Sequence, residues 1–204
     1  MVEHLHDPIL FEGDLTSIKD ACEFIIRCDR IYHLAGRNRA PLGDIIKNNI
    51  ISTSNLVLAS KIKGANPEII FASSAQVVWN IDSEYGFAKG AEEEIIKRAN
   101  KWCIFRIPNV YGPGCKPFYN SVVATFCHQI SRGEPIAVHD PSVKREFIFI
   151  DDLIEQLIHP EFNTIKTLNG ETLTIGDIKF LLTDGLGTHA KLEKCLNYYK
   201  YLVD

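Results

Sequence analysis

Apolar residues along this chain fall into short β-rich runs that alternate with longer stretches of helical periodicity. The short runs predict strands at residues 9–12, 30–35, 68–73, 102–107, 136–139, 145–150 and 164–168. The periodic stretches predict helices at residues 17–28, 42–63, 85–99 and 121–131, one that opens at Asp151 and Asp152, and two more in the tail. An alternation of this kind is typical of βα units built around a parallel sheet.

Two local signals support the predicted helix boundaries. Gly64, followed closely by Pro67, is expected to end the helix at 42–63, because glycine commonly closes a helix and proline cannot continue one. In the next helix the acids precede the bases, the order that suits the helix dipole: Glu92, Glu93 and Glu94, then Lys97 and Arg98.

The size and charge of the chain narrow the classes of function. It has 204 residues, 46% of them hydrophobic, and a formal net charge of -4. That length supports one good core with room for a small appended lobe. The charge gives no electrostatic basis for binding nucleic acid or a membrane surface. The start shows no signal-peptide pattern, and no stretch reaches the roughly 18 apolar residues of a membrane span.

The six cysteines are scattered, without a C-x-x-C pair or a zinc-like spacing. Reduced thiols are the simplest interpretation, so we expect a cytoplasmic location. Cys115, in a Gly/Pro loop, is a candidate nucleophile for which no base can be assigned. His4 and His6 have no third or fourth ligand nearby, which disfavours metal binding.

Ser74, Tyr85 and Lys89 supply the side chains needed to move a proton in carbonyl and alcohol chemistry. Helix positions four apart share a face, so the Lys89 ammonium is expected beside the Tyr85 phenol. A nearby cation favours phenolate and lowers the phenol pKa from about 10 toward neutral pH. Tyr85 would then act as general acid or base while Ser74 holds the substrate oxygen. The alternative is an ordinary helix pair.

Small or polar residues also follow other predicted strands, at the carboxyl ends where parallel sheets bind ligands. Ala35 and Gly36 would let a cofactor lie close to the backbone. Asn109 offers an amide to a polar ligand, or alternatively organises a turn beside the preceding proline.

Arg145 offers a guanidinium fork to a diphosphate, or alternatively pairs with Glu146 or Asp151 at the surface. We interpret His33, on an apolar strand, as a hydrogen-bonded core histidine rather than a catalyst. Asp151 and Asp152 are interpreted as capping a helix.

Taken in order, these segments resemble the extended short-chain dehydrogenase/reductase family, the NAD-dependent epimerases, dehydratases and reductases of nucleotide sugars, from about residue 9 to residue 182. Residues 117–127 and the short gap between Ser74 and Tyr85 are similar to capsule-biosynthesis sugar-nucleotide reductases of the CapF/WbjC type. Enzymes of that type reduce a 4-keto sugar nucleotide. The resemblance implies NAD or NADP as cofactor and a nucleotide sugar as substrate.

The resemblance also assigns roles to the residues at matching positions. Catalysis falls to Ser74, Tyr85 and Lys89. Cofactor binding falls to Asp14, Leu15, Leu34, Ala35, Gly36, Ser73, Tyr85, Lys89, Ile107 and Pro108. Substrate binding falls to Ser74, Asn109, Asn120 and Arg145. Asn49 matches an asparagine in the helix that follows the small residues.

The chain departs from the family pattern in several places. Ser74-Ala75-Gln76 stands where the dehydratase branch has Thr-Asp-Glu, so the acid that expels water is missing and dehydration is not expected. The family's opening strand, Gly-rich turn and helix have no counterpart here, and neither does the cupin domain that follows in the reductase relatives. Residues 185–190 fit G-x-G-x-x-A as a string, but no convincing strand precedes them, so a helix C-cap is favoured.

We therefore expect an α/β protein with a Rossmann-like parallel sheet, truncated at its N-terminal side. Residues 1–110 would form a partial cofactor-binding region, and residues 111–204 a small substrate-binding lobe interleaved with it. The strand at 30–35 would be an exposed edge, so either the strand at 9–12 pairs with it or another chain covers it, as in a homo-oligomer.

The expected function is an NAD(P)-dependent reductase or epimerase that acts on a nucleotide sugar in surface-polysaccharide biosynthesis. The alternative is an N-terminally truncated, non-catalytic remnant that binds a sugar nucleotide or a partner chain.

Overall fold

A computed structural model describes residue 5 and residues 7–202. The chain divides into two compact units. The first unit is Met1–Ile107 with Leu157–Leu168, and the second unit is Pro108–Gln156 with Asn169–Asp204. Each unit has its own apolar core and is described separately.

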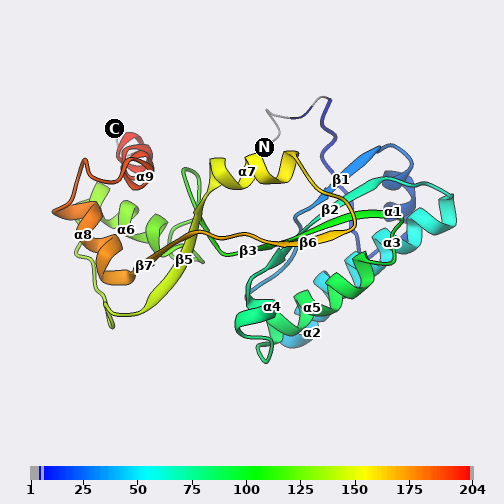
Figure 1. Ribbon diagram of the computed structural model, residues 1–204, viewed down its shortest axis with the longest axis horizontal. Helices are drawn as coiled ribbons and strands as arrows, with labels where there is room; N and C mark the ends of the chain where they lie inside the picture. Colours follow the sequence, from blue (N-terminus) through cyan, green and yellow to red (C-terminus); the bar gives the residue numbers. More distant parts are fainter. Residues whose placement is uncertain (1–4, 6, 203–204) are drawn as a thin grey trace. The chain divides into compact units, whose positions relative to one another are not determined.

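The first unit contains a four-stranded sheet whose strands all run parallel (Figure 1). Its order is β1-β2-β3-β6, formed by β1 (Arg30–His33), β2 (Glu68–Ser74), β3 (Lys101–Ile107) and β6 (Thr164–Thr167). The predicted strands at 30–35, 68–73, 102–107 and 164–168 are thereby confirmed, as is the parallel sheet. The carboxyl end of β2, at Ser74, lies beside Ile107 at the end of β3.

Apart from α4, the helices of the first unit follow the predicted pattern. They are α1 (Ile18–Ile25), α2 (Leu42–Ile45), the π-helical segment η2 (Ile46–Ile51), α3 (Ser52–Lys63), α4 (Gln76–Trp79) and α5 (Glu84–Ile96). α3 and α5 lie side by side along one face of the sheet, and α1 packs on α3 (Figure 1). The predicted helix at 42–63 is a continuous helical stretch, and Gly64 ends it in the left-handed conformation at φ 62°.

The core of the first unit fills the space between the sheet and these helices. Its buried apolar residues are Ala21, Ile25, Ile31, Leu56, Val57, Ala59, Ile69, Phe71, Ile96 and Ile104. Ile69 and Phe71, two positions apart on β2, place their side chains on the same face of the sheet, as the period of a strand requires.

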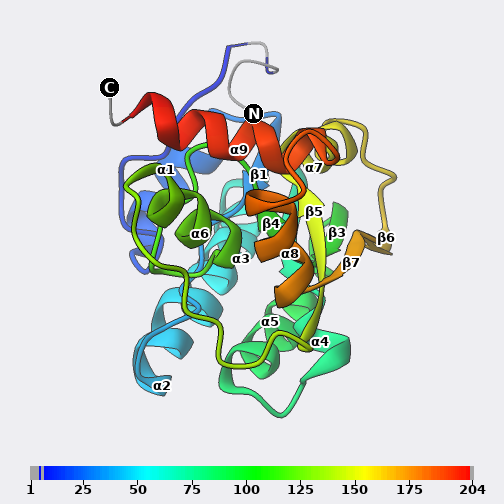
Figure 2. The same cartoon turned by 90° about the vertical axis from the view of Figure 1, so that its left-hand side faces the viewer.

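The second unit is built on a smaller mixed sheet, ordered β4-β5-β7. β4 (Asn109–Tyr111) pairs parallel with β5 (Lys144–Phe149), and β7 (Glu171–Thr174) pairs antiparallel with β5. α6 (Val122–Ser131), α8 (Ile175–Thr183) and α9 (Ala190–Tyr201) pack together (Figure 2), and α7 (Ile150–Ile158) runs across the boundary between the units in the sequence. The core consists of Tyr111, Val123, Ala124, Phe126, Cys127, Phe147, Phe149, Ile178, Leu182, Leu192, Cys195, Leu196 and Tyr199.

The predicted strand at 9–12 is wrong. These residues form no strand and pair with no edge, and Ile9 and Leu10 are exposed. The segment is held instead by Phe11, whose ring lies 4.8 Å from that of Phe24 on α1. Among the described residues β2 is the only strand that pairs with β1. The outer edge of β1 is therefore not covered by another described segment of the same chain.

The predicted strand at 136–139 is also wrong, because side chains bind the backbone of this region. Lys179 Nζ donates to Ile136 O at 3.3 Å, and Gln129 Nε2 donates to Pro135 O at 3.0 Å. Three short elements, α4, β4 and β7, were not predicted. Each has only three or four residues, too few to establish a period.

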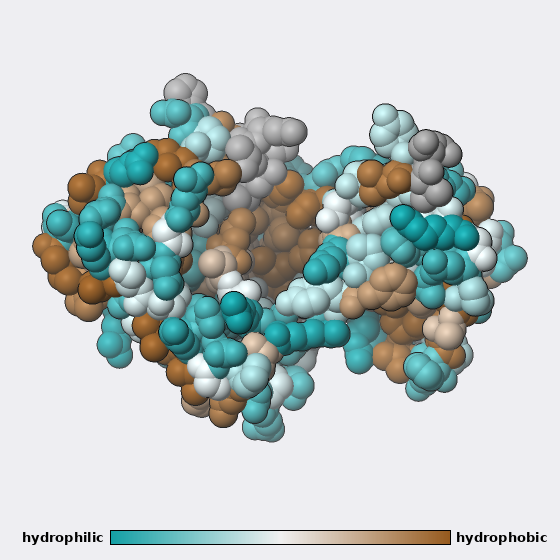
Figure 3. All heavy atoms as spheres, turned by 180° about the vertical axis from the view of Figure 1, so that it is seen from behind, coloured by the Kyte–Doolittle hydropathy of each residue, from teal (hydrophilic) through white to brown (hydrophobic). Residues whose placement is uncertain are grey.

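The surface mixes hydrophilic and apolar side chains. On the face in Figure 3 teal and brown residues are interspersed over both units. Within the part of the chain that the structure describes, no helix combines the length and apolarity needed to cross a bilayer.

Candidate active site

The candidate site lies where β2 ends and α5 begins. Ser74 is the last residue of β2, and its Oγ accepts a hydrogen bond from Gln76 N at 3.2 Å. Ser83 caps α5 by accepting from Gly86 N at 3.0 Å, which places Tyr85 in the first turn. Lys89 follows one turn later on the same face, as its spacing from Tyr85 predicted.

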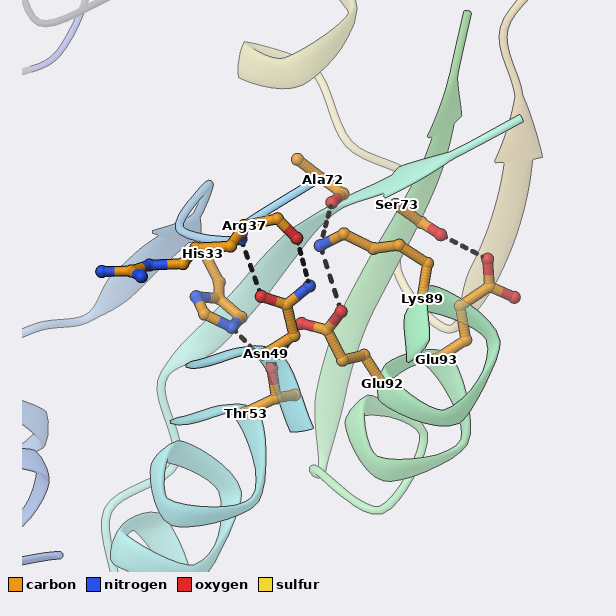
Figure 4. A network of polar contacts seen from close by, with 9 residues as sticks. All are labelled: His33, Arg37, Asn49, Thr53, Ala72, Ser73, Lys89, Glu92 and Glu93. Atoms are coloured by element: carbon orange, nitrogen blue, oxygen red, sulfur yellow. Dashed lines mark hydrogen bonds and ion pairs between the residues drawn. The ribbon is translucent and has the colours of Figure 1, made fainter. Parts of the chain in front are cut away.

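Lys89 is buried, with 3% of its surface exposed, and it points toward β2 (Figure 4). Its Nζ donates to Ala72 O at 3.2 Å and lies 4.4 Å from the centre of the Phe71 ring. The same Nζ lies 3.2 Å from Glu92 Oε2. The ammonium is therefore held by a carbonyl, an aromatic face and a carboxylate.

Glu92 belongs to a chain of buried polar groups that reaches β1. Thr53 Oγ1 donates to Glu92 Oε1 at 2.8 Å, and His33 Nε2 lies 2.8 Å from the same hydroxyl. A hydroxyl has one hydrogen to donate, and Thr53 gives it to the carboxylate, so His33 Nε2 must donate to Thr53. Burial lowers the pKa of His33 to about 3, which keeps the ring neutral. The interpretation of His33 as a core histidine agrees with this arrangement.

Asn49 fixes the loop that follows β1. It is fully buried in η2, and its Oδ1 accepts from Arg37 N at 2.7 Å while its Nδ2 donates to Arg37 O at 3.0 Å. The loop is thereby held next to the site, and Gly36 lies against Lys89: a Cβ at Gly36 would stand 3.3 Å from Nζ. Any side chain at position 36 would crowd the ammonium.

A second buried carboxylate, that of Glu93, connects β2 to β3. Glu93 Oε1 accepts from Ser73 Oγ at 2.6 Å and from Arg106 Nε at 3.0 Å, while Oε2 accepts from Arg106 Nη2 at 2.7 Å. This two-pronged pair fixes the strand ends beside Ser74. The Ser73 hydroxyl is thus engaged within the protein, and its predicted cofactor contact stays a prediction.

The expected acidification of Tyr85 by Lys89 is wrong for this arrangement. Burial, and after it the Glu92 charge, raises the pKa of Tyr85 to about 12. The partners of the Lys89 ammonium are Ala72 O and Glu92. Burial lowers the pKa of Lys89 and raises that of Glu92, while the attraction between them opposes both shifts.

The remaining predicted cofactor residues of the first unit are Asp14, Leu15, Leu34, Ala35 and Ile107. Asp14 accepts from Thr16 N and Thr16 Oγ1, each at 2.8 Å, which lowers the pKa of its carboxyl. Leu15 O accepts from Asn55 Nδ2 at 2.9 Å, while Leu34 and Ala35 are exposed. These roles stay predictions.

Pro108 and the predicted substrate residues other than Ser74 belong to the second unit. Asn109 Nδ2 donates to Glu146 O at 2.9 Å, and Arg145 Nη1 donates to Lys144 O at 2.9 Å. Asn120 is exposed just before α6.

Arg145 does not make the surface pairs considered for it. Glu146 Oε1 accepts from Gly170 N at 2.6 Å, and Asp151 pairs with Lys194 at 2.8 Å. Asp151 and Asp152 lie within the first turn of α7 rather than before it.

The other candidate groups carry no chemistry that the structure supports. Burial raises the pKa of Cys115, which keeps it a thiol. Gly185 follows α8 and donates to Phe180 O at 2.8 Å, as expected of a residue that closes a helix. His4 and His6 lie outside the described residues.

Sequence reasoning missed Glu92 and Thr53. From the sequence, Glu92 is only one of the acids whose order suits the helix dipole, whereas the structure shows its side chain fully buried. The signal was present, because Tyr85, Lys89 and Glu92 follow the i, i+4, i+7 spacing of one helix face.

Comparison with known proteins identifies the family. The model of the NAD dependent epimerase/dehydratase family matches residues 2–160. The chain belongs to this family. It is 37% identical, over 145 residues, to UDP-2-acetamido-2,6-beta-L-arabino-hexul-4-ose reductase of Pseudomonas aeruginosa. That alignment covers 68% of this chain and 38% of the reductase, so the chain matches well under half of that relative's length.

Two solved structures share the fold of this family member. UDP-glucose 4-epimerase of Thermotoga maritima, solved with UDP-glucose, has a TM-score of 0.84 at 18% identity, covering 100% of this chain and 88% of that one. The capsular polysaccharide assembling protein CapF of Staphylococcus aureus has a TM-score of 0.67 at 26% identity, covering 91% and 56%. The predicted Rossmann-like α/β class and the resemblance to capsule-biosynthesis reductases are both confirmed.

Proposed function

We propose that this chain carries the reactive site of an NAD(P)-dependent reductase or epimerase that acts on a nucleotide sugar in surface-polysaccharide biosynthesis. The observation that carries the proposal is the seating of α5 against the end of β2. Lys89 Nζ donates to Ala72 O at 3.2 Å, two residues before Ser74. This contact holds the helix that bears Tyr85 and Lys89 against the strand that bears Ser74. Family membership and the similarity to a UDP-sugar reductase support the same conclusion.

Each of the three side chains has a distinct role in this proposal. Tyr85 exchanges a proton with the reacting oxygen of the sugar, and Ser74 hydrogen-bonds that oxygen. Lys89 supplies positive charge near the phenol and stabilises negative charge that develops on it. A bound nicotinamide supplies or accepts the hydride.

The protonation of Tyr85 supports the reductive direction. With a pKa of about 12 the phenol keeps its proton at neutral pH, and reduction of a carbonyl requires an acid at that position. Epimerisation through an oxidised sugar requires a base there first. Since the Pseudomonas relative is a hexul-4-ose reductase, we favour a 4-keto sugar linked to a nucleoside diphosphate as substrate.

We propose NAD or NADP as cofactor, bound along the loop after β1 and the ends of β2 and β3. The loop fits such a ligand, because Asn49 holds its backbone in place and Gly36 leaves the ammonium of Lys89 uncrowded. Asp14, Leu15, Leu34, Ala35, Ser73, Ile107 and Pro108 complete the proposed cofactor contacts.

Asn109, Asn120 and Arg145 are the proposed substrate contacts in the second unit, with Arg145 on the diphosphate. We also propose a homo-oligomer, because no strand among the described residues pairs with the outer edge of β1, and an open edge is a template for another chain.

The proposal is tested by binding followed by turnover. NADH and NADPH are titrated by fluorescence and UDP by calorimetry, and a UDP-4-keto sugar is then supplied with the reduced cofactor. Tyr85→Phe should lower kcat by roughly 10²–10⁴-fold while leaving substrate affinity intact, because only the proton transfer is lost. Tyr201→Phe, at a tyrosine that is 80% exposed, is the matched control. A fully active Tyr85→Phe variant ends the proposal.

The alternative function is a non-catalytic protein that binds a sugar nucleotide or a partner chain. The observation that favours it is the engagement of Lys89 by Glu92, together with a Tyr85 phenol that is not activated as a base. UDP binding without binding of either dinucleotide would support this alternative and contradict the enzymatic proposal.

A further inference from the structure

Glu92 is the least expected member of the buried network in Figure 4. Its side chain is fully buried, and its Oε1 accepts a hydrogen bond from Thr53 Oγ1 at 2.8 Å. Within the described residues Oε2 has no hydrogen bond of acceptable geometry. The group that faces Oε2 is the Lys89 ammonium at 3.2 Å.

A buried ion pair of this kind is expected to add little net stability. Removing a carboxylate and an ammonium from water costs several kcal/mol per ion, and well-packed apolar residues of similar volume are often at least as stable. A buried pair of this kind in a candidate active site is therefore better explained by what it does to the reactive group.

The geometry shows what the carboxylate does. Tyr85, Lys89 and Glu92 share one face of α5, with Lys89 between the other two. The carboxylate cannot easily swing away, because Thr53 holds it and His33 holds Thr53. The ammonium is consequently held against Glu92 and Ala72 O.

We infer that Glu92 is a positioning residue: its carboxylate holds the Lys89 ammonium against β2 and so sets where that charge stands relative to Tyr85. The inference rests on the proposed function for its consequence in turnover, but the positioning itself belongs to the chain alone. The charged and titratable groups around this pair are Tyr85 and Glu93 on α5, His33 on β1, and Arg106 on β3 through its pair with Glu93.

Titration of Lys89 tests the inference without cofactor or substrate. Lysine is isotope-labelled at Cε, and the Lys89 resonance is assigned from its absence in Lys89→Met. Glu92→Gln should lower the midpoint of the Lys89 titration by roughly one pH unit or more, because a buried ammonium loses its counter-ion. Glu92→Asp keeps the charge but withdraws it by one methylene, so the midpoint should fall less. Glu94→Gln, which breaks only the exposed pair with Lys97, should leave the midpoint unchanged.

Equal midpoints in the wild-type chain and Glu92→Gln would overturn the inference. If Glu92→Gln does not fold, Glu92→Asp provides the test. A Lys89 midpoint equal to that of the wild-type chain in Glu92→Asp would then also overturn the inference. A role confined to folding predicts a lower Tm with an unchanged pH profile of kcat, whereas positioning predicts a displaced profile in both variants. A wild-type chain without turnover, in which the Lys89 midpoint nevertheless depends on Glu92, would refute the proposed function and leave the positioning intact.

Discussion

The two units treat charge in opposite ways. All the polar or charged residues buried in the described part of the chain lie in the first unit: His33, Asn49, Ser52, Thr53, Ser60, Ser73, Lys89, Glu92 and Glu93. The second unit buries aromatic, aliphatic and cysteine side chains instead, and its ion pairs, such as Lys194 with Asp151, lie on the surface. The first unit buries polar groups at a cost in stability, whereas the second unit has an ordinary apolar core.

This difference is informative because both units fold by the same means. Each packs helices on a sheet, and the second unit does so without a buried charged residue among those that the structure describes. The buried polar groups lie in the same unit as Tyr85 and Lys89, which supports the proposed position of the site. Both tryptophans, Trp79 and Trp102, also belong to this unit, so fluorescence reports its unfolding separately from that of the second unit.

The largest expected effect comes from breaking the buried pair on one side. Glu92→Leu or Lys89→Met alone should destabilise the first unit by about 3–5 kcal/mol, because each leaves an uncompensated buried charge. The double variant should recover most of this loss, since it buries no charge. Urea unfolding followed by tryptophan fluorescence measures all three. A double variant no more stable than the singles would mean that the pair is not the relevant interaction.

A smaller effect is expected from the buried histidine. The pKa of His33 is about 3 in the folded chain against 6.5 for the free side chain, so the unfolded state binds the extra proton first. Its contribution to stability is complete above the unfolded value and is lost progressively as the pH falls toward 3. At about pH 5 the loss should reach about 2 kcal/mol relative to neutral pH.

The pH dependence is measured by urea unfolding of the wild-type chain and His33→Gln, which cannot take up the proton. The variant should lack this part of the acid sensitivity. His159→Gln, at an exposed histidine of the same unit, should retain it. If stability falls equally with pH in all three chains, protonation of His33 is not the cause of the acid sensitivity.

The smallest effect is expected at the surface of the second unit. Lys194 and Asp151 are each 57% exposed and pair at 2.8 Å. Lys194→Ala should change the free energy of unfolding by roughly 0–1 kcal/mol, because solvent screens the pair. Urea unfolding followed by tyrosine circular dichroism, a signal to which both units contribute, provides the measurement. A loss of unfolding free energy as large as that from breaking the Lys89–Glu92 pair would contradict the difference drawn between the units.

Much of the fold could be predicted, because its long elements have clear periods. The strands that became β2 and β3 are each seven residues long with a run of four apolar residues inside, and the helix that became α5 carries a capping serine and a buried face. The predictions that failed concerned short segments. Residues 9–12 looked like a strand in isolation, but a strand requires a partner, and the chain context that decides pairing is not a local property.

The placement of Tyr85 and Lys89 one turn apart on a helix was predicted, but the electrostatics around them was not. The spacing of Tyr85 and Lys89 gave the shared helix face correctly. It could not give the pKa of Tyr85, because that depends on burial and on Glu92, whose depth depends on the packing of α5 against α3 and β2. The sequence alone does not show which glutamates of this run are buried, because burial depends on how the helix packs.

The side chain of Asn49 has a practical consequence for any attempt to transplant this loop. Its amide acts on Arg37 as a second peptide group would, offering one donor and one acceptor at a fixed separation. The residue that fixes the loop conformation therefore lies twelve positions further along the chain, in a π-helical turn, and not in the loop itself. A graft of the loop into another scaffold would keep its conformation only if that turn travelled with it.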